Sequence, residues 1–198
     1  MRKLTVDDIV DTRAYERERD ELRRHVIDLK KHRRIALGPI MTIVFENTVT
    51  MRWQVQEMAR AERMQTDEQI AHEVDTYNQL IPDADELSAT LMIELTSEPA
   101  LREWLPRLVG IHQHIAVVLP DGTRIVGAVS EEDELRLTRD DITAAVHFLR
   151  FRFAPSDVEM FSSGPVHIVV DHPEYDHDVT LTPEQHAELL SDLNDASG

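Results

Sequence analysis

The sequence predicts an α+β fold: a mainly antiparallel sheet of seven or eight strands, with helices packed mostly on one face and a long N-terminal helix. Three observations favour this fold. Apolar and polar residues alternate over residues 87–95 and 142–153, which is the period of a half-buried strand. The Asp-Gly pair at 121–122 is typical of a hairpin turn. Helical spacing is concentrated in the first half, so too few helices separate the later strands for a parallel βαβ sheet.

The chain of 198 residues suits one domain, since domains commonly run to about 100–200 residues. We expect residues 1–198 to form a single α+β domain, with a helical arm over 1–33, a sheet-and-helix body over 34–194 and a tail over 195–198. Apolar residues at helical spacing give the arm's long helix a narrow stripe: Tyr15, Leu22, Val26 and Leu29. So thin a stripe packs on one surface only, and a second subunit is one candidate. We therefore predict a homodimer.

The segment from Arg34 to Arg63 is the one around which we expect the fold to be organised. Its first part, Ile35 to Phe45, is apolar on both faces, as in an interior strand. A turn at Glu46-Asn47-Thr48 then leads into a second strand, because apolar and polar residues alternate from Val49 to Val55. A helix to Arg63 follows. The pattern therefore predicts a hairpin with its turn near residue 46.

The remaining elements follow from caps, periodicity and turn residues. Capping boxes at Thr66 and Thr182 begin two helices, and Pro82 ends the first of them. The other expected elements are a short turn at 5–8, a helix from Ser97, strands at 87–95, 112–119, 123–129, 142–153 and 166–170, a helix at 155–161, an acidic loop at Ser130–Glu134 and a polar loop at Asp171–Asp178.

Composition excludes several classes of protein. The net charge of −17 disfavours binding to phosphate backbones and anionic membranes, so we predict no nucleic acid and no membrane partner. With no cysteine, the chain carries no iron–sulfur cluster, disulfide or thiolate nucleophile. The basic start has no apolar stretch behind it, which argues against a secretion signal, and no run approaches the ~20 apolar residues of a membrane span. We expect a cytoplasmic protein.

The charge is unevenly distributed along the chain. Residues 1–36 carry a net charge of +3 and the remainder −20. Either a basic N-terminal helix docks on an acidic body, or the cations collect near the carboxyl end of that helix, where its dipole favours them. We prefer the second interpretation.

Seven of the ten histidines follow residue 108, which raises the question of a metal site. His112 and His114 would share one face of the expected strand, and the loop at 171–178 offers further nitrogen and oxygen donors. The candidate ligands of a divalent metal (zinc, iron or manganese) are His112, His114, His172, His177 and Asp176, with Asp178 as an alternative donor. We prefer the competing interpretation, surface or core histidines without a metal, because His-x-His is common on strands.

Three polar groups are candidates for binding. Gln56, Glu57 and Arg60 lie three or four residues apart on a helix face, where pairing along a solvated helix is the competing explanation. Tyr77 and Asn78, with residues 86–88, bracket the turn at Pro82; they either line a pocket mouth, or Asn78 and Ser88 satisfy backbone groups of the turn. Arg150 and Arg152 share one strand face and could hold a small acid, although strand arginines more often face water. The sequence contains no phosphate-binding glycine loop, nucleophile elbow, zinc-protease or kinase motif.

Five stretches resemble a bacterial family that carries no assigned activity, catalogued as domain of unknown function 3501. They are LTVDDIV with YERERDELRR and LKKHRRIALGP, VFENTVTMRWQVQEMARAER, YNQLIPDADELSATLMIEL, AVHFLRFRF and IVVDHPEYDHDVTLTPE. The family has no established catalytic residues to transfer. Its genes often lie near those for rubrerythrin-like proteins and iron–sulfur oxidoreductases. The resemblance therefore implies, by association, a role around non-haem iron or peroxide defence.

We accordingly expect an accessory or binding protein without catalytic activity, with an iron-dependent redox protein as a partner. The alternative is a metal-dependent enzyme that uses the histidines and carboxylates of the C-terminal half.

Overall fold

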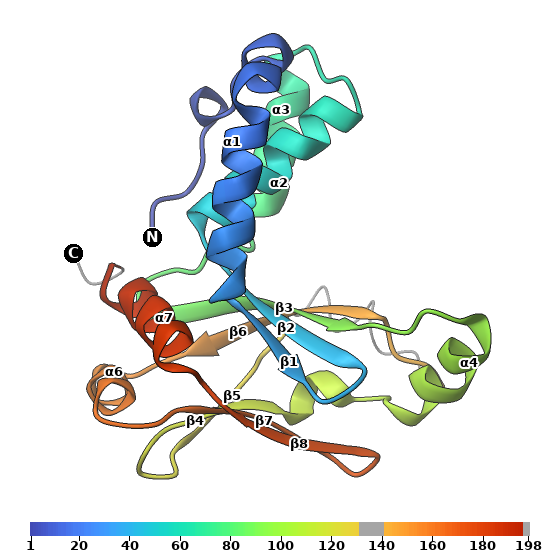
Figure 1. Ribbon diagram of the computed structural model, residues 1–198, viewed down its shortest axis with the longest axis vertical. Helices are drawn as coiled ribbons and strands as arrows, with labels where there is room; N and C mark the ends of the chain where they lie inside the picture. The colour runs from blue at the N-terminus through green and yellow to red at the C-terminus, as the bar shows by residue number, and fades with distance from the viewer. Residues whose placement is uncertain (131–140, 196–198) are drawn as a thin grey trace.

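The computed structural model describes residues 1–130 and 141–195. Its strands form two antiparallel sheets of four (Figure 1). Sheet A has the order β1-β2-β3-β6, and sheet B has the order β5-β4-β7-β8. The bounds are β1 Arg34–Leu37, β2 Met41–Glu46, β3 Glu86–Ile93, β4 Ile115–Val118, β5 Arg124–Val126, β6 Val146–Arg152, β7 His167–His172 and β8 Tyr175–Thr180. The predicted α+β fold with antiparallel strands is confirmed, but the eight strands form two sheets and not one.

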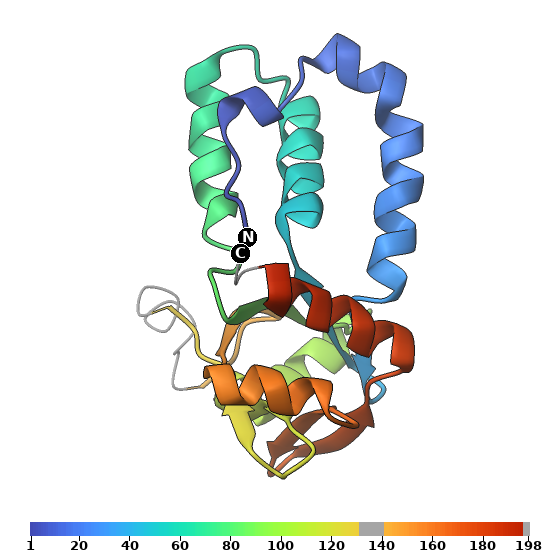
Figure 2. The ribbon, with the colours of Figure 1, turned by 90° about the vertical axis from the view of Figure 1, so that its left-hand side faces the viewer.

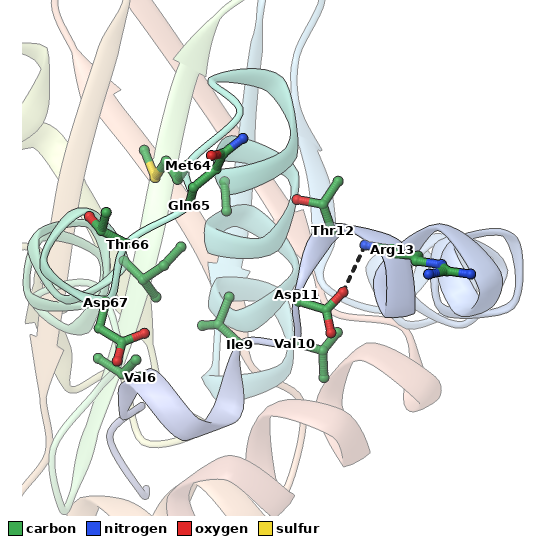
Figure 3. Close-up of a pocket in the computed structure, with 12 residues that line it drawn as sticks. Val6, Ile9, Val10, Asp11, Thr12, Arg13, Met64, Gln65, Thr66 and Asp67 are labelled. Carbon is green, nitrogen blue, oxygen red and sulfur yellow. Dashed lines mark hydrogen bonds between the residues drawn. The ribbon is translucent and has the colours of Figure 1, made fainter.

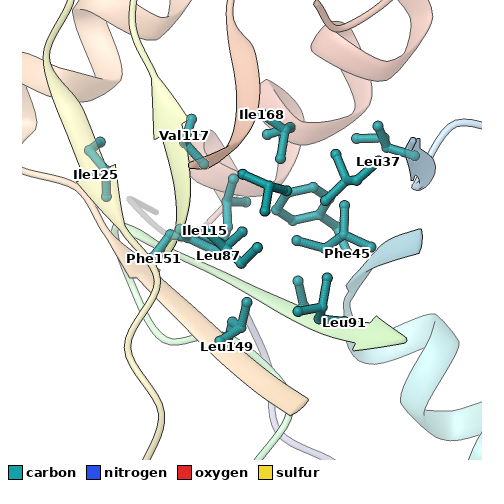
Figure 4. Packing of buried hydrophobic residues seen from close by; sticks show 14 of the residues in the cluster. Leu37, Phe45, Leu87, Leu91, Ile115, Val117, Ile125, Leu149, Phe151 and Ile168 are labelled. Carbon is teal, nitrogen blue, oxygen red and sulfur yellow. The ribbon is translucent and has the colours of Figure 1, made fainter. Parts of the chain in front are cut away.

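The two sheets pack face to face and enclose the main core (Figure 4). Sheet A contributes Phe45, Leu91 and Phe151, and sheet B contributes Ile115 and Ile168, all at most 1% exposed. The expected alternation explains this face of sheet A, because every second residue from Leu87 to Ile93 and from His147 to Phe153 is buried in it. Burial of these side chains is the main favourable contribution to the stability of the body.

The helices fall into two groups (Figures 1 and 2). The short turn η1 (Val6–Asp8) and the helices α1 (Thr12–Lys31), α2 (Thr48–Ala61) and α3 (Asp67–Asn78) form a helical unit that stands over the outer face of sheet A, the face directed away from sheet B. It has its own small core, formed by Leu4, Met51, Val55, Val74 and Ile81. The arm that we expected over residues 1–33 thus includes α2 and α3.

The second group borders the two sheets. It comprises α4 (Glu98–Arg107), η2 (Ile111–His114), α6 (Pro155–Ser162) and α7 (Pro183–Asp195). Within the described ranges, no helix is long and apolar enough to cross a membrane. The acidic loop expected at Ser130–Glu134 lies outside the described residues beyond Ser130, as does the tail beyond Asp195.

The hairpin predicted near residue 46 is wrong in its second half. Residues 48–61 form α2, because Asn47 caps this helix: its side chain accepts a hydrogen bond from the backbone N–H of Thr50 (3.0 Å), whose hydroxyl accepts one from the N–H of Asn47 (2.9 Å). The observed hairpin is β1–β2, which turns at Gly38, where φ is +73°. The helix cap at Asn47 therefore outweighs the strand-like alternation of Val49–Val55.

Two expectations in the C-terminal half also need correction. The polar loop expected at 171–178 is a hairpin between β7 and β8, in which His172 and Tyr175 are paired. His112 and His114 lie in the short helix η2 and not on a strand. The first error comes from reading a short polar segment without its pairing partner, and the second from starting the strand before Ile115.

The apolar stripe of α1 packs within the chain. Tyr15 and Val26 are 1% and 3% exposed, and the ring of Tyr15 lies edge-on to Trp53 of α2, with centroids 6.2 Å apart. The surface for which we predicted a second subunit is therefore covered, at these two positions, by the protein itself.

Arg33 connects the start of β1 to the C-terminal helix. Its side chain is fully buried and donates hydrogen bonds to the carbonyl oxygens of Phe45 (2.8 Å) and Glu46 (3.2 Å). It also pairs with two carboxylates of α7, those of Glu188 and Asp192. Burial raises the pKa of Asp192, and the guanidinium of Arg33 opposes this. Arg33 follows the helix end to which we attributed the cations of residues 1–36. In the structure it is a buried group that connects β2 with α7.

Candidate functional site

A cleft separates the helical unit from the outer face of sheet A and consists of two cavities. The first has a volume of about 330 Å³ and the second about 470 Å³. Tyr77, Leu80 and Phe148 line both cavities, so the two adjoin. We call them together the sheet A cleft. The first cavity is further lined by Lys30, Arg34, Val44, Glu46, Met51, Gln54, Thr90, Met92 and Val146, and the second by Thr76, Gln79, Ser88, Ser130, Leu149 and Arg150.

Strand register places the floor of the cleft. Val44, Thr90 and Phe148 lie side by side on neighbouring strands, and in the next row Glu46 is paired with Ser88. These residues alternate with those that fill the main core, so their side chains project to the opposite face. Phe148 and Met92 are only partly buried, and Val146 is 44% exposed. The strands of sheet A thus have one buried face that is apolar except for His147, and one mixed, partly open face.

Glu46 is the unusual group of this floor. It is 6% exposed, and the hydroxyl of Thr90 donates a hydrogen bond to its Oε1 atom over 3.0 Å. Its Oε2 atom is buried, and the described part of the chain provides no hydrogen-bond partner for it. Buried polar atoms are almost always paired, so an unpaired carboxylate oxygen beside a cavity indicates a place for a ligand. We predicted Glu46 to lie in a turn and did not propose it as a site residue. A usable signal was its place in β2, where it shares one strand face with Thr42 and Val44.

Two of the predicted binding residues instead hold the N-terminal segment. The amide of Gln56 exchanges two hydrogen bonds with the backbone of Val10 (2.8 and 3.1 Å), and the amide of Asn78 exchanges two with Leu4 (2.8 and 2.9 Å). Each amide satisfies backbone groups that an extended segment cannot satisfy itself. These two side chains are therefore structural, although Asn78 satisfies the backbone of Leu4 and not that of the turn at Pro82.

Glu57 and Arg60 belong to an ion-pair network between α1 and α2. The carboxylate of Glu57 accepts hydrogen bonds from the side chains of Arg19 (2.8 and 3.0 Å) and Tyr15 (2.6 Å), with Arg60 farther away at 3.4 Å. Hydrogen bonds from Arg19 lower the pKa of Glu57 to about 2. Burial and the bond to Glu57 raise the pKa of Tyr15. This network joins two helices.

Of the seven predicted binding residues, Tyr77 and Arg150 line the sheet A cleft. Arg150 is already paired, because it donates hydrogen bonds to the carboxylate of Glu86 and the carbonyl oxygen of Gln79. Arg152 donates a hydrogen bond to the same carboxylate over 3.2 Å. The two arginines therefore neutralise a buried glutamate.

The histidines divide into separate places. His112 stacks on His147, with ring centroids 5.5 Å apart, in the interior. Burial lowers the pKa of His147 to about 4, and its Nε2 atom lies 2.9 Å from the carbonyl oxygen of Ala144. His114 contacts Asp171 (3.0 Å) and lies edge-on to the ring of His172. His177 packs on the ring of Tyr175.

The predicted metal ligands do not converge. Nε2 of His172 lies 3.1 Å from the carbonyl oxygen of Val109, and its Nδ1 accepts a hydrogen bond from the N–H of Glu174 (3.2 Å), so both ring nitrogens are engaged. Asp176 and Asp178 alternate with His177 along β8 and project to the opposite face. Over residues 1–130 and 141–195, no three histidine or acidic side chains are placed to hold one metal ion.

Another cavity, of about 430 Å³, lies at the far end of the helical unit (Figure 3). Its polar residues act as helix caps: Asp11 accepts a hydrogen bond from the N–H of Arg13 (2.9 Å), and Thr66 accepts one from the N–H of Gln69 (3.4 Å). Because these groups already serve the helices, this cavity is a weaker candidate than the sheet A cleft.

Fold and cavities together define the class: an α+β protein in which two antiparallel sheets pack face to face and a helical unit stands over one of them. The chain belongs to the DUF3501 family, whose model is described as a protein of unknown function and matches residues 3–193. The expected family resemblance is thus confirmed.

A solved structure from Burkholderia pseudomallei K96243, described as a novel protein of unknown function, is similar over nearly the whole chain. The two are 34% identical, with a TM-score of 0.88, over 97% of this chain and 100% of that one. No curated protein is significantly similar to the chain.

Proposed function

We propose that this protein is an accessory binding protein that holds a small organic molecule in the sheet A cleft. The observation that carries the proposal is the pair of adjoining cavities on a sheet face with exposed apolar residues. Ligand sites in proteins are typically concave, largely apolar and of about 300–1,000 Å³, with a few polar groups that fix orientation. Each of the two cavities lies within that range, at about 330 and 470 Å³.

The setting of this activity follows from the family resemblance. We propose an iron-dependent redox or peroxide-defence protein as the partner, because the gene neighbourhood of the family implies it. A homodimer is a further part of the proposal, although Tyr15 and Val26 of the α1 stripe are buried within the chain. Size-exclusion chromatography with light scattering tests the homodimer, and we expect the mass of a dimer. A pull-down tests the partner, and we expect the protein to capture an iron-containing protein. A monomer that captures no iron protein would contradict them.

A matched pair of valines tests the cleft itself. Val146 is 44% exposed and lines the first cavity, whereas Val126 is 51% exposed on sheet B and lines neither cavity of the cleft. In Val146→Trp the added indole fills the cavity without entering the main core, and Val126→Trp adds the same group elsewhere. Ligands would be found by thermal shift and followed by NMR.

We expect Val146→Trp to weaken ligand binding by about tenfold or more, which corresponds to about 1.4 kcal/mol, and Val126→Trp to leave it unchanged. Equal binding by the two variants, or the lack of a ligand among apolar amines, alcohols and carboxylic acids, would overturn the proposed site. The melting temperatures of both variants report whether they are folded.

A further inference from the structure

Resting on the proposed function, we infer that the sheet A cleft binds a small apolar amine, whose ammonium group pairs with the buried carboxylate of Glu46. Glu46 lines the first cavity and is 6% exposed. One carboxylate oxygen is held by Thr90 and the other has no partner in the described part of the chain. An ammonium group carries three hydrogen-bond donors and a positive charge, which complement a buried carboxylate oxygen.

The cations near Glu46 are mostly committed to other groups. The side chain of Arg33 donates to the backbone carbonyl of Glu46, and its remaining bonds go to Phe45, Glu188 and Asp192. Arg34 pairs with Glu94, an exposed residue of the neighbouring segment. Arg150 pairs with Glu86. None of these three side chains donates to the unpaired oxygen of Glu46.

Lys30 is the internal competitor for this position. It lines the same cavity, and the structure gives it no ion pair among the described residues. A lysine side chain has an ammonium group on an apolar stem, which is the same chemistry as the inferred ligand. The experiment must therefore separate a ligand from this side chain.

The walls of the cavity determine the rest of the ligand. Most of its other lining groups are apolar side chains: Val44, Met51, Leu80, Met92, Val146 and Phe148. An apolar body fits these walls, and aromatic rings such as those of Tyr77 and Phe148 favour a nearby cation. The net charge of −17 also raises the local concentration of cations and lowers that of acids. Charge and shape thus favour an amine over the acid that we considered for Arg150 and Arg152.

Three probes of equal length test the inference: n-hexylamine, n-hexanol and n-hexanoate, titrated into the full-length protein and followed by NMR. We expect the amine to bind about tenfold or more tightly than the alcohol, since a hydrogen bond to a charged group contributes more than a neutral one. The carboxylate should bind more weakly than the alcohol. Alcohol or carboxylate binding as tight as that of the amine would overturn the inference while the proposed binding function stands. If none of the three binds in the cleft, both fail.

Four variants complete the test. Glu46→Gln keeps the shape and removes the charge, so we expect it to abolish the preference for the amine and to leave hexanol binding unchanged. Thr90→Val, which no longer orients the carboxylate, should weaken amine binding several-fold. Glu159→Gln is the matched control, because Glu159 is an exposed acidic residue of α6 that lines neither cavity, and it should bind as the wild type does. Lys30→Met should keep the preference for the amine.

Three of the four variants also have an outcome that contradicts the inference. Retention of the amine preference in Glu46→Gln, or its loss in Glu159→Gln, would place the ammonium site elsewhere. Loss of the preference in Lys30→Met would assign it to Lys30 and not to Glu46. The signal dispersion of each variant shows that it is folded, and Thr90→Val decides the case if Glu46→Gln does not fold.

Discussion

The helical unit and the two-sheet body are stabilised in different ways. The body encloses a continuous apolar core from both sheets, whereas the core of the helical unit contains five fully buried apolar residues. Polar clamps supplement that small core: side-chain amides hold the backbone of the N-terminal segment, and Glu57 joins α1 to α2. Apolar burial is insensitive to pH, but ion pairs are not. The helical unit, which covers the cleft, therefore responds to pH through its ion-pair network, whereas the body responds through separate buried groups such as His147.

The largest effect should come from the main core. Phe151 and Phe148 lie on the same strand, β6, but on opposite faces: Phe151 is fully buried in the core and Phe148 is partly exposed in the cleft. Phe151→Ala should lower the free energy of unfolding by about 3–5 kcal/mol. Phe148→Ala should cost about 1 kcal/mol and weaken ligand binding. Urea denaturation measures both, and equal losses would remove the distinction between the two faces.

The next effect concerns the turn of the β1–β2 hairpin. At Gly38, φ is +73°, and an added Cβ atom would lie 2.4 Å from Nε2 of His177 and 2.5 Å from the hydroxyl of Tyr175. Gly38→Ala should therefore cost about 1–3 kcal/mol from backbone strain and displace Tyr175, whose hydroxyl donates to the carbonyl oxygen of Leu37 (2.6 Å). Thermal unfolding checks this. Gly122→Ala is the control for φ alone, since an added Cβ there meets nothing within 4 Å.

A comparable effect, confined to one region, is expected from one clamp of the helical unit. Asn78→Ala leaves the N–H and carbonyl oxygen of Leu4 without their side-chain partners, which should cost about 1–3 kcal/mol. Hydrogen exchange should show the loss in the helical unit while the exchange of sheet B is unchanged. Loss of protection across both sheets would mean that the two regions unfold as one.

The smallest effect is a dependence on pH. The pKa of Glu57 is about 2 in the folded protein and 4.5 ordinarily, because Arg19 favours its ionised form. Its contribution is therefore complete above pH 4.5 and disappears as the pH falls towards 2. We expect Glu57→Gln to be about 1–2 kcal/mol less stable than the wild type at pH 7 and equally stable near pH 2. Denaturation at both pH values measures this, and a difference that persists at the lower pH would contradict it.

The sequence by itself determined the features that depend on local periodicity and composition. Alternation from Leu87 to Ile93 and from His147 to Phe153 predicted two strands of sheet A with their core faces, because strand side chains alternate regardless of what they pack on. The lack of cysteine excluded an iron–sulfur cluster bound by this chain. The five sequence stretches indicated the DUF3501 family.

Only the tertiary structure decided how these elements combine. The cap at Asn47 overrode the alternation of Val49–Val55, and strand pairing divided the eight strands into two sheets. The tertiary structure also separated the histidines and placed the unpaired oxygen of Glu46 beneath α2 and α3. These outcomes depend on contacts between residues far apart in the chain, and no local pattern records which distant segment will lie on which face.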